Sequence, residues 1–347
     1  MNRHTPPDLD ALEQHVLRTA AEPCAVITDA EVHRALTRDP CGYFRRLHES
    51  LRAIADGGLH VDMPPKQVFA DPDGLADFRV MPCVVRGESG TTKSVKLVGT
   101  NIVQSTVPDQ ITVGKALVID PVENYITHIV DACLLSSART GLCAALAMHL
   151  LAARSAQLTV IGSGRVGYYA AFYAAAVCGV KHIDFVDREP ARAAAATAAL
   201  NARLSGITCR ATPLTELTAT DVVVLATTSA RPICSPPAWN ASLVISLGAD
   251  IDHQSELDAA WAGTADIYVD TMDSARFGDL KAWIAQDRLH PGSITDLIML
   301  LQNGVPAADD RCRLFIATGS ALFDNLTLGY LLQQSTRNTT SVTRLPK

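Results

Sequence analysis

The sequence lacks the features of membrane-spanning, secreted and nucleic-acid-binding proteins. No apolar run reaches the roughly 18 residues of a membrane span, because Arg139 and His149 interrupt the longest candidate, residues 132–153. The formal net charge of −6 and the lack of a basic run argue against general nucleic-acid binding. The first residues also lack the charged-then-apolar pattern of a signal peptide. We therefore expect a cytoplasmic protein that binds neither membranes nor nucleic acids.

The cysteines lack the spacing of metal or disulfide sites. All nine are isolated in the sequence, with no CxxC pair and no histidine cluster at ligand spacing. Most are flanked by alanine, valine or leucine, which is typical of small buried side chains in a reducing compartment. We therefore expect no structural metal and no disulfide, and we assign no catalytic role to the cysteines or to the isolated histidines.

The chain does contain a pattern typical of a dinucleotide-binding loop. An apolar run at 158–161 leads into Gly162, Gly164 and Gly167, and an alanine-rich helical segment follows. In such loops the first glycine permits a tight turn, the second lets the backbone approach the pyrophosphate, and the third allows close packing of helix and strand. The N-terminus of the helix adds amide donors and the positive end of its dipole.

The next apolar run indicates which dinucleotide binds. Residues 182–186 end at Asp187, close to the usual offset of about 20 residues beyond the glycine loop. An acid at this position binds the ribose hydroxyls and repels a 2′-phosphate, which favours NAD(H) over NADP(H). Arg188 argues the other way, because a guanidinium in this place accommodates that phosphate. We expect NAD as the cofactor, with NADP as the less favoured alternative.

The order of local patterns divides the chain into two parts. Short β-type runs separated by turn-rich pieces fill residues 65–130, and expected helices at 9–20, 30–36 and 43–55 precede them, which indicates an α+β domain. After an expected helix at 132–153, strands and helices alternate as in a parallel sheet with helices on both faces. Further expected elements are helices at 280–286, 294–301 and 320–332 and a strand at 313–319, with frayed polar residues from 333 onward.

Six further segments resemble, in order, those of the ornithine cyclodeaminase/μ-crystallin family. They are MPPK at 63–66, FRVMP at 78–82, VKLVGTN at 95–101, ARTG at 138–141, SLGAD at 246–250 followed by Glu256-Leu257, and ATGSALFDN at 317–325. The resemblance implies an α/β fold in which a Rossmann NAD-binding domain, residues 132–317, is inserted in an α+β domain. That second domain, residues 1–131 plus 318–347, would bind substrate and form a homodimer.

The resemblance also implies a reaction. In this family NAD(P) exchanges a hydride with the α-carbon of a small amino or imino acid, and members include archaeal-type alanine dehydrogenases, ketimine reductases and cyclodeaminases. We expect an NAD(H)-dependent amino acid dehydrogenase or imine reductase. The first alternative is an ornithine or lysine cyclodeaminase, which forms a cyclic imino acid and releases ammonia. The second is a non-catalytic protein that binds NAD(H) or a small effector.

Three cations form the predicted substrate site. Arg139 matches the family's RT motif and would bind the substrate carboxylate through both arms of its guanidinium, with a structural salt bridge as the alternative. Lys66 and Lys96 match MPPK and VKLVGTN and would share that role, although lysines on strand faces are often merely exposed. Cyclodeaminases of the family carry arginine at the position of Lys66, whereas archaeal-type alanine dehydrogenases carry lysine. Lys66 therefore favours a dehydrogenase or imine reductase, and a desolvated lysine there would also exchange a proton.

One acid completes the predicted chemistry. Asp250 follows an expected strand at the C-terminal edge of the parallel sheet, where such folds bind ligands. The resemblance makes it the acid/base or electrostatic partner of the reacting nitrogen, and the alternative is the N-cap of a following helix. The predicted cofactor contacts are Thr112, Thr140, Gly162, Gly164, Arg165, Val166, Gly167, Asp187, Arg188, Thr227, Thr228, Gly248 and Gly319.

Overall fold

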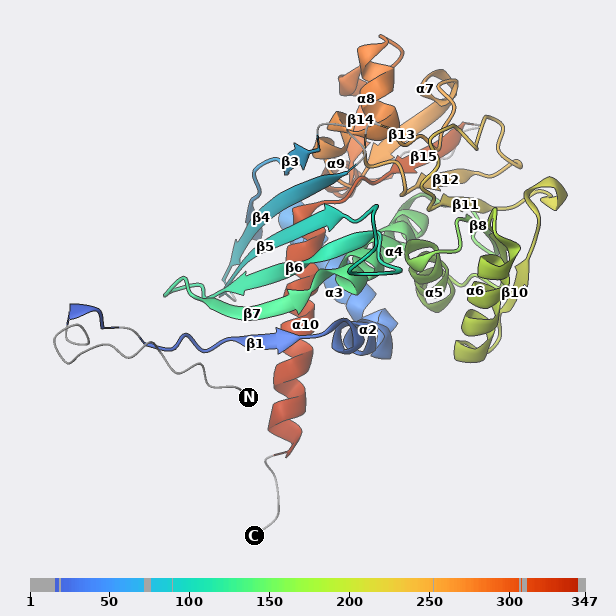
Figure 1. Cartoon of the computed structure of the whole chain (residues 1–347). Coiled ribbons are helices and arrows are strands. Elements are labelled where there is room, and N and C mark those ends of the chain that lie inside the picture. The colour runs from blue at the N-terminus through green and yellow to red at the C-terminus, as the bar shows by residue number, and fades with distance from the viewer. Residues whose placement is uncertain are drawn as a thin grey trace.

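The computed structural model describes residues 16–18, 20–71, 76–88, 90–251, 253–305, 307 and 311–342. These residues form a mixed sheet and an all-parallel sheet, with helices between and around them (Figure 1). This arrangement confirms the expected α/β fold with a Rossmann-like sheet. Most of the helix expected at 9–20 lies outside the described residues.

The mixed sheet is built from the first part of the chain. Its strands lie in the order β1-β7-β6-β5-β4-β2, and β3 also pairs with β4. Their bounds are Ala25–Ile27 (β1), Leu59–Asp62 (β2), Gln67–Ala70 (β3), Asp77–Gly87 (β4), Gly90–Thr100 (β5), Thr112–Ile119 (β6) and Ile126–Asp131 (β7). Because side chains alternate along a strand, β4 turns Asp77, Arg79 and Met81 to one buried face. This face carries charged side chains toward the interior.

Helices cover that face of the mixed sheet. They are α2 (Asp29–Arg38), α3 (Pro40–Ala55), α4 (Ala132–Leu151) and α10 (Ala321–Val342). In Figure 1, α10 runs behind the sheet and then projects beyond it. The expected fraying from residue 333 is wrong for the backbone, which stays helical to Val342. The α2 helix begins at Asp29, close to the start of the helix expected at 30–36. Thr28 and Glu31 fix this start through a reciprocal capping box.

The α4 helix is apolar on all sides because it lies in the interior. It contacts α2, α5, β6, β12 and α10, and nearly all of its side chains are buried. Its length and composition would also suit a membrane span, but 78% of its apolar window is buried inside the protein. This burial is typical of a core helix.

The second sheet has its neighbouring strands parallel, in the order β10-β9-β8-β11-β12-β15-β13-β14. The strands are Gln157–Ile161 (β8), His182–Val186 (β9), Thr208–Ala211 (β10), Val222–Leu225 (β11), Leu243–Ser246 (β12), Ala265–Val269 (β13), Ile294–Asp296 (β14) and Cys312–Ile316 (β15). The helices are Arg165–Val177 (α5), Pro190–Arg203 (α6), Trp261–Thr264 (α7), Gly278–Ala285 (α8) and Leu297–Asn303 (α9). The helix expected over 294–301 is wrong in its first turn, because residues 294–296 pair with β13.

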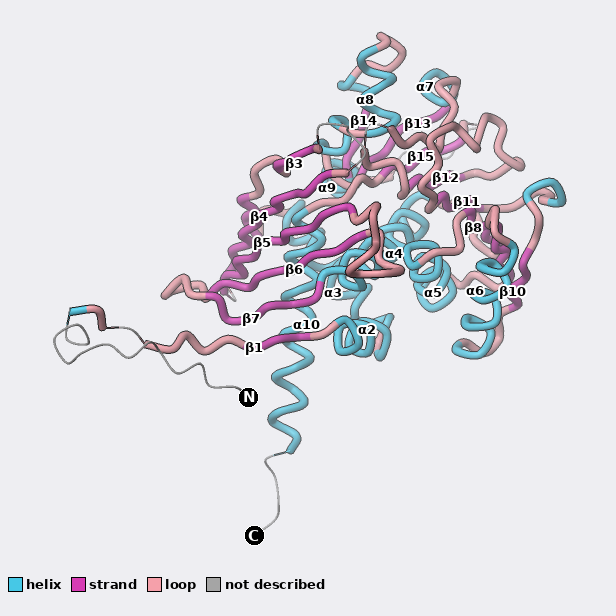
Figure 2. Tube along the Cα trace, in the orientation of Figure 1, coloured by secondary structure: helices cyan, strands magenta, loops and turns pink. Residues whose placement is uncertain are grey.

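Two chain connections join the sheets. The last residue of β7 leads directly into α4, and β15 leads through residues 317–320 into α10. Figure 2 shows the loop between β5 and β6 reaching toward α4 and α5. The inner face of the mixed sheet therefore lies opposite the C-terminal ends of the parallel strands, where open α/β sheets bind their ligands. The expected domain boundaries, at 131/132 and 317/318, stay a prediction.

Candidate active site

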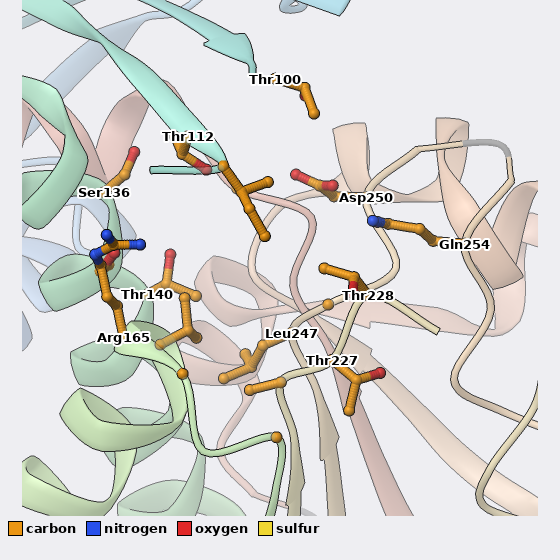
Figure 3. A pocket seen from close by; sticks show the side chains of 18 of the residues that line it. Thr100, Thr112, Ser136, Thr140, Arg165, Thr227, Thr228, Leu247, Asp250 and Gln254 are labelled. Atoms are coloured by element: carbon orange, nitrogen blue, oxygen red, sulfur yellow. The ribbon is translucent and has the colours of Figure 1, made fainter. Parts of the chain in front are cut away.

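A cavity of about 760 Å³ lies between the two sheets. The inner face of β4 and β5, the first turns of α4, the glycine loop and the ends of several parallel strands form its walls. In Figure 3, Ser136, Thr140 and Arg165 lie on one side of this space, and Asp250 and Thr228 lie across from them. All predicted site residues line the cavity except Lys66 and Gly167.

The glycine loop has the geometry that a pyrophosphate requires. Gly162 has a φ of 100°, and a β-carbon there would lie 2.3 Å from the carbonyl oxygen of Ala226. A β-carbon on Gly167 would lie 2.0 Å from the carbonyl oxygen of Gly162, so this glycine permits close packing of α5 and does not face the cavity. A β-carbon on Gly164, the N-cap of α5, would meet nothing within 4 Å. That open space leaves room for phosphate oxygens at the helix N-terminus.

Asp187 lies at the end of β9, beside this loop. Its carboxylate accepts hydrogen bonds from the N–H of Ser163 (2.8 Å) and the N–H of Glu189 (3.0 Å). These bonds hold the acid at the mouth of the glycine loop, where the ribose of a dinucleotide lies in folds of this type. Arg188 lines the same part of the cavity and is exposed. The residues present therefore fit a dinucleotide.

A buried acid that the predicted site residues omit organises the strand ends nearby. Glu256 is fully buried and accepts hydrogen bonds from the N–H and hydroxyl of Thr227 (2.7 and 2.9 Å). Its other oxygen accepts from the hydroxyl of Ser246 (2.7 Å) and the N–H of Gly248 (2.9 Å). Burial raises the pKa of Glu256, although these bonds act against the rise. One carboxylate thus ties together the loops after β11 and β12, which line the cavity.

The first charged cluster of the cavity consists of Lys96, Arg139 and Asp324. The distance from Lys96 Nζ to Asp324 Oδ2 is 2.7 Å, and that from Arg139 Nε to Asp324 Oδ1 is 2.9 Å. Burial, followed by the charge of Arg139, lowers the pKa of Lys96 to about 7. Burial alone would raise the pKa of Asp324, but the two cations outweigh it and hold this pKa below its ordinary value. Two cations facing one acid leave an excess of one positive charge.

Asp324 is not among the predicted site residues, although it lies in the family segment at 317–325. The signal was available, because Asp324 interrupts an apolar helical run as Arg139 interrupts another. A charge inside an apolar helix is costly unless a partner lies nearby. Gly319, which is predicted as a cofactor contact, lies against this cluster instead: its φ is 86°, and a β-carbon there would lie 3.0 Å from Arg139 Nη2.

The second charged cluster consists of Asp77, Arg79 and Asp250. The Arg79 guanidinium donates from Nε and Nη2 to the Asp77 carboxylate (3.0 and 2.9 Å) and from Nη1 to Asp250 Oδ2 (2.7 Å). Burial alone would raise the pKa of Asp250, but the charge and hydrogen bond of Arg79 hold it below its ordinary value. Asp250 lines the cavity with 37% of its side chain exposed. Here two acids face one cation, which leaves an excess of one negative charge.

Arg79 also bears on the interpretation of Asp250. Arg79 is not among the predicted site residues, although the segment FRVMP contains it. The alternation of side chains along a strand separates two faces but does not say which of them is buried. The alternative role of Asp250 as a helix N-cap finds no support, since within the described part of residues 251–260 no helix begins.

Lys66 lies behind the cavity wall. Its ammonium donates to the carbonyl oxygen of Thr318 (2.7 Å) and lies 3.7 Å from the centre of the Phe277 ring. Burial, followed by the charge of Arg79, lowers the pKa of Lys66 to about 8. Thr318 lines the cavity and Lys66 does not, so the expected grouping of Lys66 with Lys96 and Arg139 at the cavity surface is not what the structure contains.

The remaining predicted residues lie where the loop between β5 and β6 meets α4 and α5. Thr112 begins β6, Thr140 lies in α4, and both line the cavity. Arg165 donates to the carbonyl oxygen of Asp109 in that loop, which connects the loop to the start of α5. Val166 follows it in the cavity wall. Within the described ranges, no group of histidine, cysteine or acidic residues has the arrangement of a metal site.

Comparison with known proteins gives consistent relatives. Residues 25–334 match the model of the ornithine cyclodeaminase/mu-crystallin family. An alanine dehydrogenase of Archaeoglobus fulgidus is 27% identical over 311 residues, covering 86% of this chain and 91% of that protein. An L-lysine cyclodeaminase of Streptomyces rapamycinicus is 28% identical over 276 residues, covering 78% of this chain and 79% of that protein.

Solved structures show the same fold. The Δ1-pyrroline-2-carboxylate reductase of Thermococcus litoralis, in complex with NADH and L-proline, has a TM-score of 0.81 at 16% identity, covering 91% of this chain and 98% of that one. An archaeal alanine dehydrogenase dimer with bound NAD has a TM-score of 0.78 at 20% identity, covering 91% and 97%. At such identities the likeness establishes the fold alone. From the extent of the family match, the chain belongs to the ornithine cyclodeaminase/mu-crystallin family.

Proposed function

We propose that this protein is an NAD(H)-dependent oxidoreductase that moves a hydride to or from the α-carbon of a small amino or imino acid. The observation that carries the proposal is one cavity that joins a glycine loop to two charged clusters of opposite sign. When bound, NAD supplies or accepts the hydride. The relatives that bind NAD or NADH and act on alanine or proline-type substrates support the proposal.

The positive cluster would bind the substrate carboxylate. Asp324 takes the Nε–H of Arg139, which leaves the terminal N–H groups of the guanidinium for a ligand, and Lys96 adds a second cation. A carboxylate bound by both would be oriented as well as held. Contact between Lys66 and the substrate would require its ammonium to leave the Thr318 carbonyl, so we assign the carboxylate to Lys96 and Arg139 first.

The negative cluster would act at nitrogen. Arg79 keeps Asp250 ionised and engages its Oδ2, so Oδ1 is free to face a cationic amine or iminium. A fixed carboxylate beside that nitrogen stabilises the positive charge that develops when the α-carbon loses a hydride. It also accepts or returns a proton at nitrogen. Asp187 and the loops held by Glu256 would position the dinucleotide.

The test is a kinetic comparison of two arginine variants of the same helix region. Arg139→Leu should raise the KM for a neutral amino acid roughly 100-fold or more, because a buried charge-assisted pair is lost, while NADH binding stays unchanged. Arg154→Leu, at a position whose side chain is 84% exposed, serves as the control and should change neither constant. Equal KM values in the two variants would contradict the proposed carboxylate site.

A cyclodeaminase remains the second candidate, because the Streptomyces relative is an L-lysine cyclodeaminase. Incubation with L-ornithine or L-lysine and NAD+ separates the two functions. Formation of proline or pipecolate with ammonia, and without accumulation of NADH, would replace the dehydrogenase with the cyclodeaminase. NADH binding without turnover of amino acids, of keto acids with amines, or of cyclic imines would favour a binding protein instead.

The finer expectations belong to the same proposal. We propose NAD over NADP on the position of Asp187, and the ratio of the two dissociation constants tests it. We also propose a homodimer, as in the archaeal alanine dehydrogenase dimer, and a cytoplasmic location for this protein. Light scattering of the purified protein would measure the mass. The domains are proposed as residues 132–317 for the dinucleotide and 1–131 plus 318–347 for substrate and dimer contacts.

A further inference from the structure

We propose that the substrate carries an uncharged side chain, because the two charged clusters of the cavity together balance one carboxylate and one cationic nitrogen and nothing more. The inference rests on the proposed function and names its substrate class. It follows from the charge of each cluster, from the surface between the clusters, and from the partners of the charged groups around them.

The clusters face the same part of the cavity. In the register of β4 and β5, Lys96 lies opposite Met81, and Arg79 lies opposite Val98. Arg79 and Met81 are therefore successive inward-facing residues of β4, about 7 Å apart along the strand. One small molecule can reach both clusters, with its carboxylate at Lys96 and its nitrogen at Asp250.

The charges of the clusters match a zwitterion. With Lys96 protonated, Lys96 and Arg139 exceed Asp324 by one positive charge, and Asp77 and Asp250 exceed Arg79 by one negative charge. An α-amino acid, or the 2-iminium acid formed from it, presents one carboxylate and one cationic nitrogen. Its binding would leave both clusters neutral. A further charge on the side chain would then enter a buried region without a counter-ion, which is costly.

Within the described part of the chain, the surface between the clusters offers no such counter-ion. Met81 and Val98 line the cavity there, and both are buried and apolar. An additional ammonium would have to share Asp77 or Asp250 with Arg79, which already bonds to both. An additional carboxylate would have to compete with those same two acids for Arg79. Neither a diamino acid nor an amino dicarboxylic acid is therefore matched.

The other charged groups near the cavity do not change this balance. Lys66 lies behind Thr318, where the buried acid Asp270 acts on it with opposite charge in addition to Asp250, so Lys66 has a counter-ion outside the negative cluster. Among the residues that the structure describes, the remaining cavity-lining charges belong to the dinucleotide end or to the loop between β5 and β6: Asp109, Arg165, Asp187, Arg188 and Arg192. In that loop the side chain of Asp109 is exposed to solvent, where a charge is stabilised by water.

The test compares matched substrates with the full-length wild-type protein and NAD+. L-norvaline and L-ornithine have the same carbon chain, and ornithine adds only the terminal ammonium; L-norvaline and L-glutamate give the corresponding anionic comparison. NADH formation and product analysis are both measured, so that cyclisation without net redox is also detected. We expect kcat/KM for norvaline to exceed that for either charged compound by roughly 100-fold or more.

A variant reverses the discrimination. Arg79→Met removes the cation of the negative cluster and leaves Asp77 and Asp250 with room for a second ammonium, so the norvaline-to-ornithine ratio should fall at least about tenfold. Asp77→Asn makes the same cluster neutral and should weaken norvaline without any gain for ornithine. Arg86→Met removes a charge on the same strand at a side chain that is 46% exposed, and should leave the ratio unchanged.

The outcomes are distinct. Equal or better turnover of a charged compound by the wild-type protein, with formation of NADH, would overturn the inference and leave the proposed function standing. Conversion of ornithine to proline and ammonia without NADH would overturn both in favour of the cyclodeaminase. An unchanged norvaline-to-ornithine ratio in a folded Arg79→Met variant would also overturn the inference. If that variant fails to fold, a gain of ornithine turnover in Asp77→Asn would overturn it instead. Absence of turnover with every compound would overturn the proposed function and the inference together.

Discussion

Replacing Asp324 by asparagine tests the positive cluster most directly. The substitution keeps the shape of the side chain and removes the charge that faces Lys96 at 2.7 Å and Arg139 at 2.9 Å. Asp324 is 1% exposed and Lys96 is 1% exposed, so water cannot replace the lost partner. Removing one partner of a buried ion pair typically costs about 3–5 kcal/mol. We expect a loss of that size in the free energy of unfolding.

One feature of the cluster limits the loss. The pKa of Lys96 is already about 7, so this lysine can release its proton and relieve part of the repulsion with Arg139. Asp324 raises the pKa of Lys96, so without it Lys96 of the folded variant loses its proton at a lower pH than in the wild type. Wild-type Lys96 is protonated and attracted to Asp324 below about pH 7 and loses this attraction above it, so the loss should be smaller at pH 8.5 than at pH 6.5. Urea unfolding at pH 6.5 and 8.5 would measure both effects.

The control for this experiment is an exposed acid. Asp62→Asn removes a carboxylate that is 62% exposed and lies 3.9 Å from Arg86, and it should change the free energy of unfolding by less than about 0.5 kcal/mol. A loss below about 1 kcal/mol for Asp324→Asn would refute the reasoning, because it would mean that the two cations do not depend on this acid.

Three further predictions concern the ligands. Gly164→Val should raise the dissociation constant of NADH at least about tenfold in a binding titration, because the added methyl groups enter the space left for phosphate, with little loss of stability; unchanged binding would place the dinucleotide elsewhere. The inhibition constant of propionate, which lacks an amine, should rise roughly tenfold for each pH unit above 7, because Lys96 loses its charge above its pKa of about 7. An inhibition constant that does not change with pH would mean that Lys96 does not bind the carboxylate. Glu256→Gln should raise the KM for NADH more than it lowers kcat, since the loops of Thr227 and Gly248 lose shared hydrogen bonds, and an equal loss in both constants would point to a direct role in the reaction.

The candidate nucleotide end of the site could be located from the sequence because its residues are local. The glycine loop, the strand before it, the helix after it and Asp187 lie within about 30 consecutive residues, and the spacing of the glycines specifies both turn and packing. The structure gives Gly162 and Gly167 the close contacts that this interpretation requires. The strands that the sequence did not predict, β1, β2, β10 and β14, are only three or four residues long, which is too short for a clear alternating pattern.

At the proposed substrate end, the sequence placed some residues at the cavity and not others. Lys96, Arg139 and Asp250 line the cavity, and the family resemblance had pointed to all three. Lys66 is grouped with them only because it matches a family motif. A motif does not show how deeply a side chain is buried, and the Lys66 ammonium lies behind Thr318, to whose carbonyl oxygen it donates. Arg79 and Asp324 lie in family segments but have no predicted role. Each contacts a charged partner that is distant in the sequence, and the sequence does not show which residue that partner is.

The sequence by itself determined the class of fold and the dinucleotide loop, since strand and helix periods, turns and the close approach of a backbone depend on neighbouring residues. Only the tertiary structure decided which charges meet. Arg139 and Asp324 are 185 residues apart in the chain, and Arg79 and Asp250 are 171 apart. Their distances, and hence the balance of charge that a substrate encounters, depend on how the two sheets pack against each other. Ion pairs act over a few ångströms in space, and distance along the chain does not constrain them.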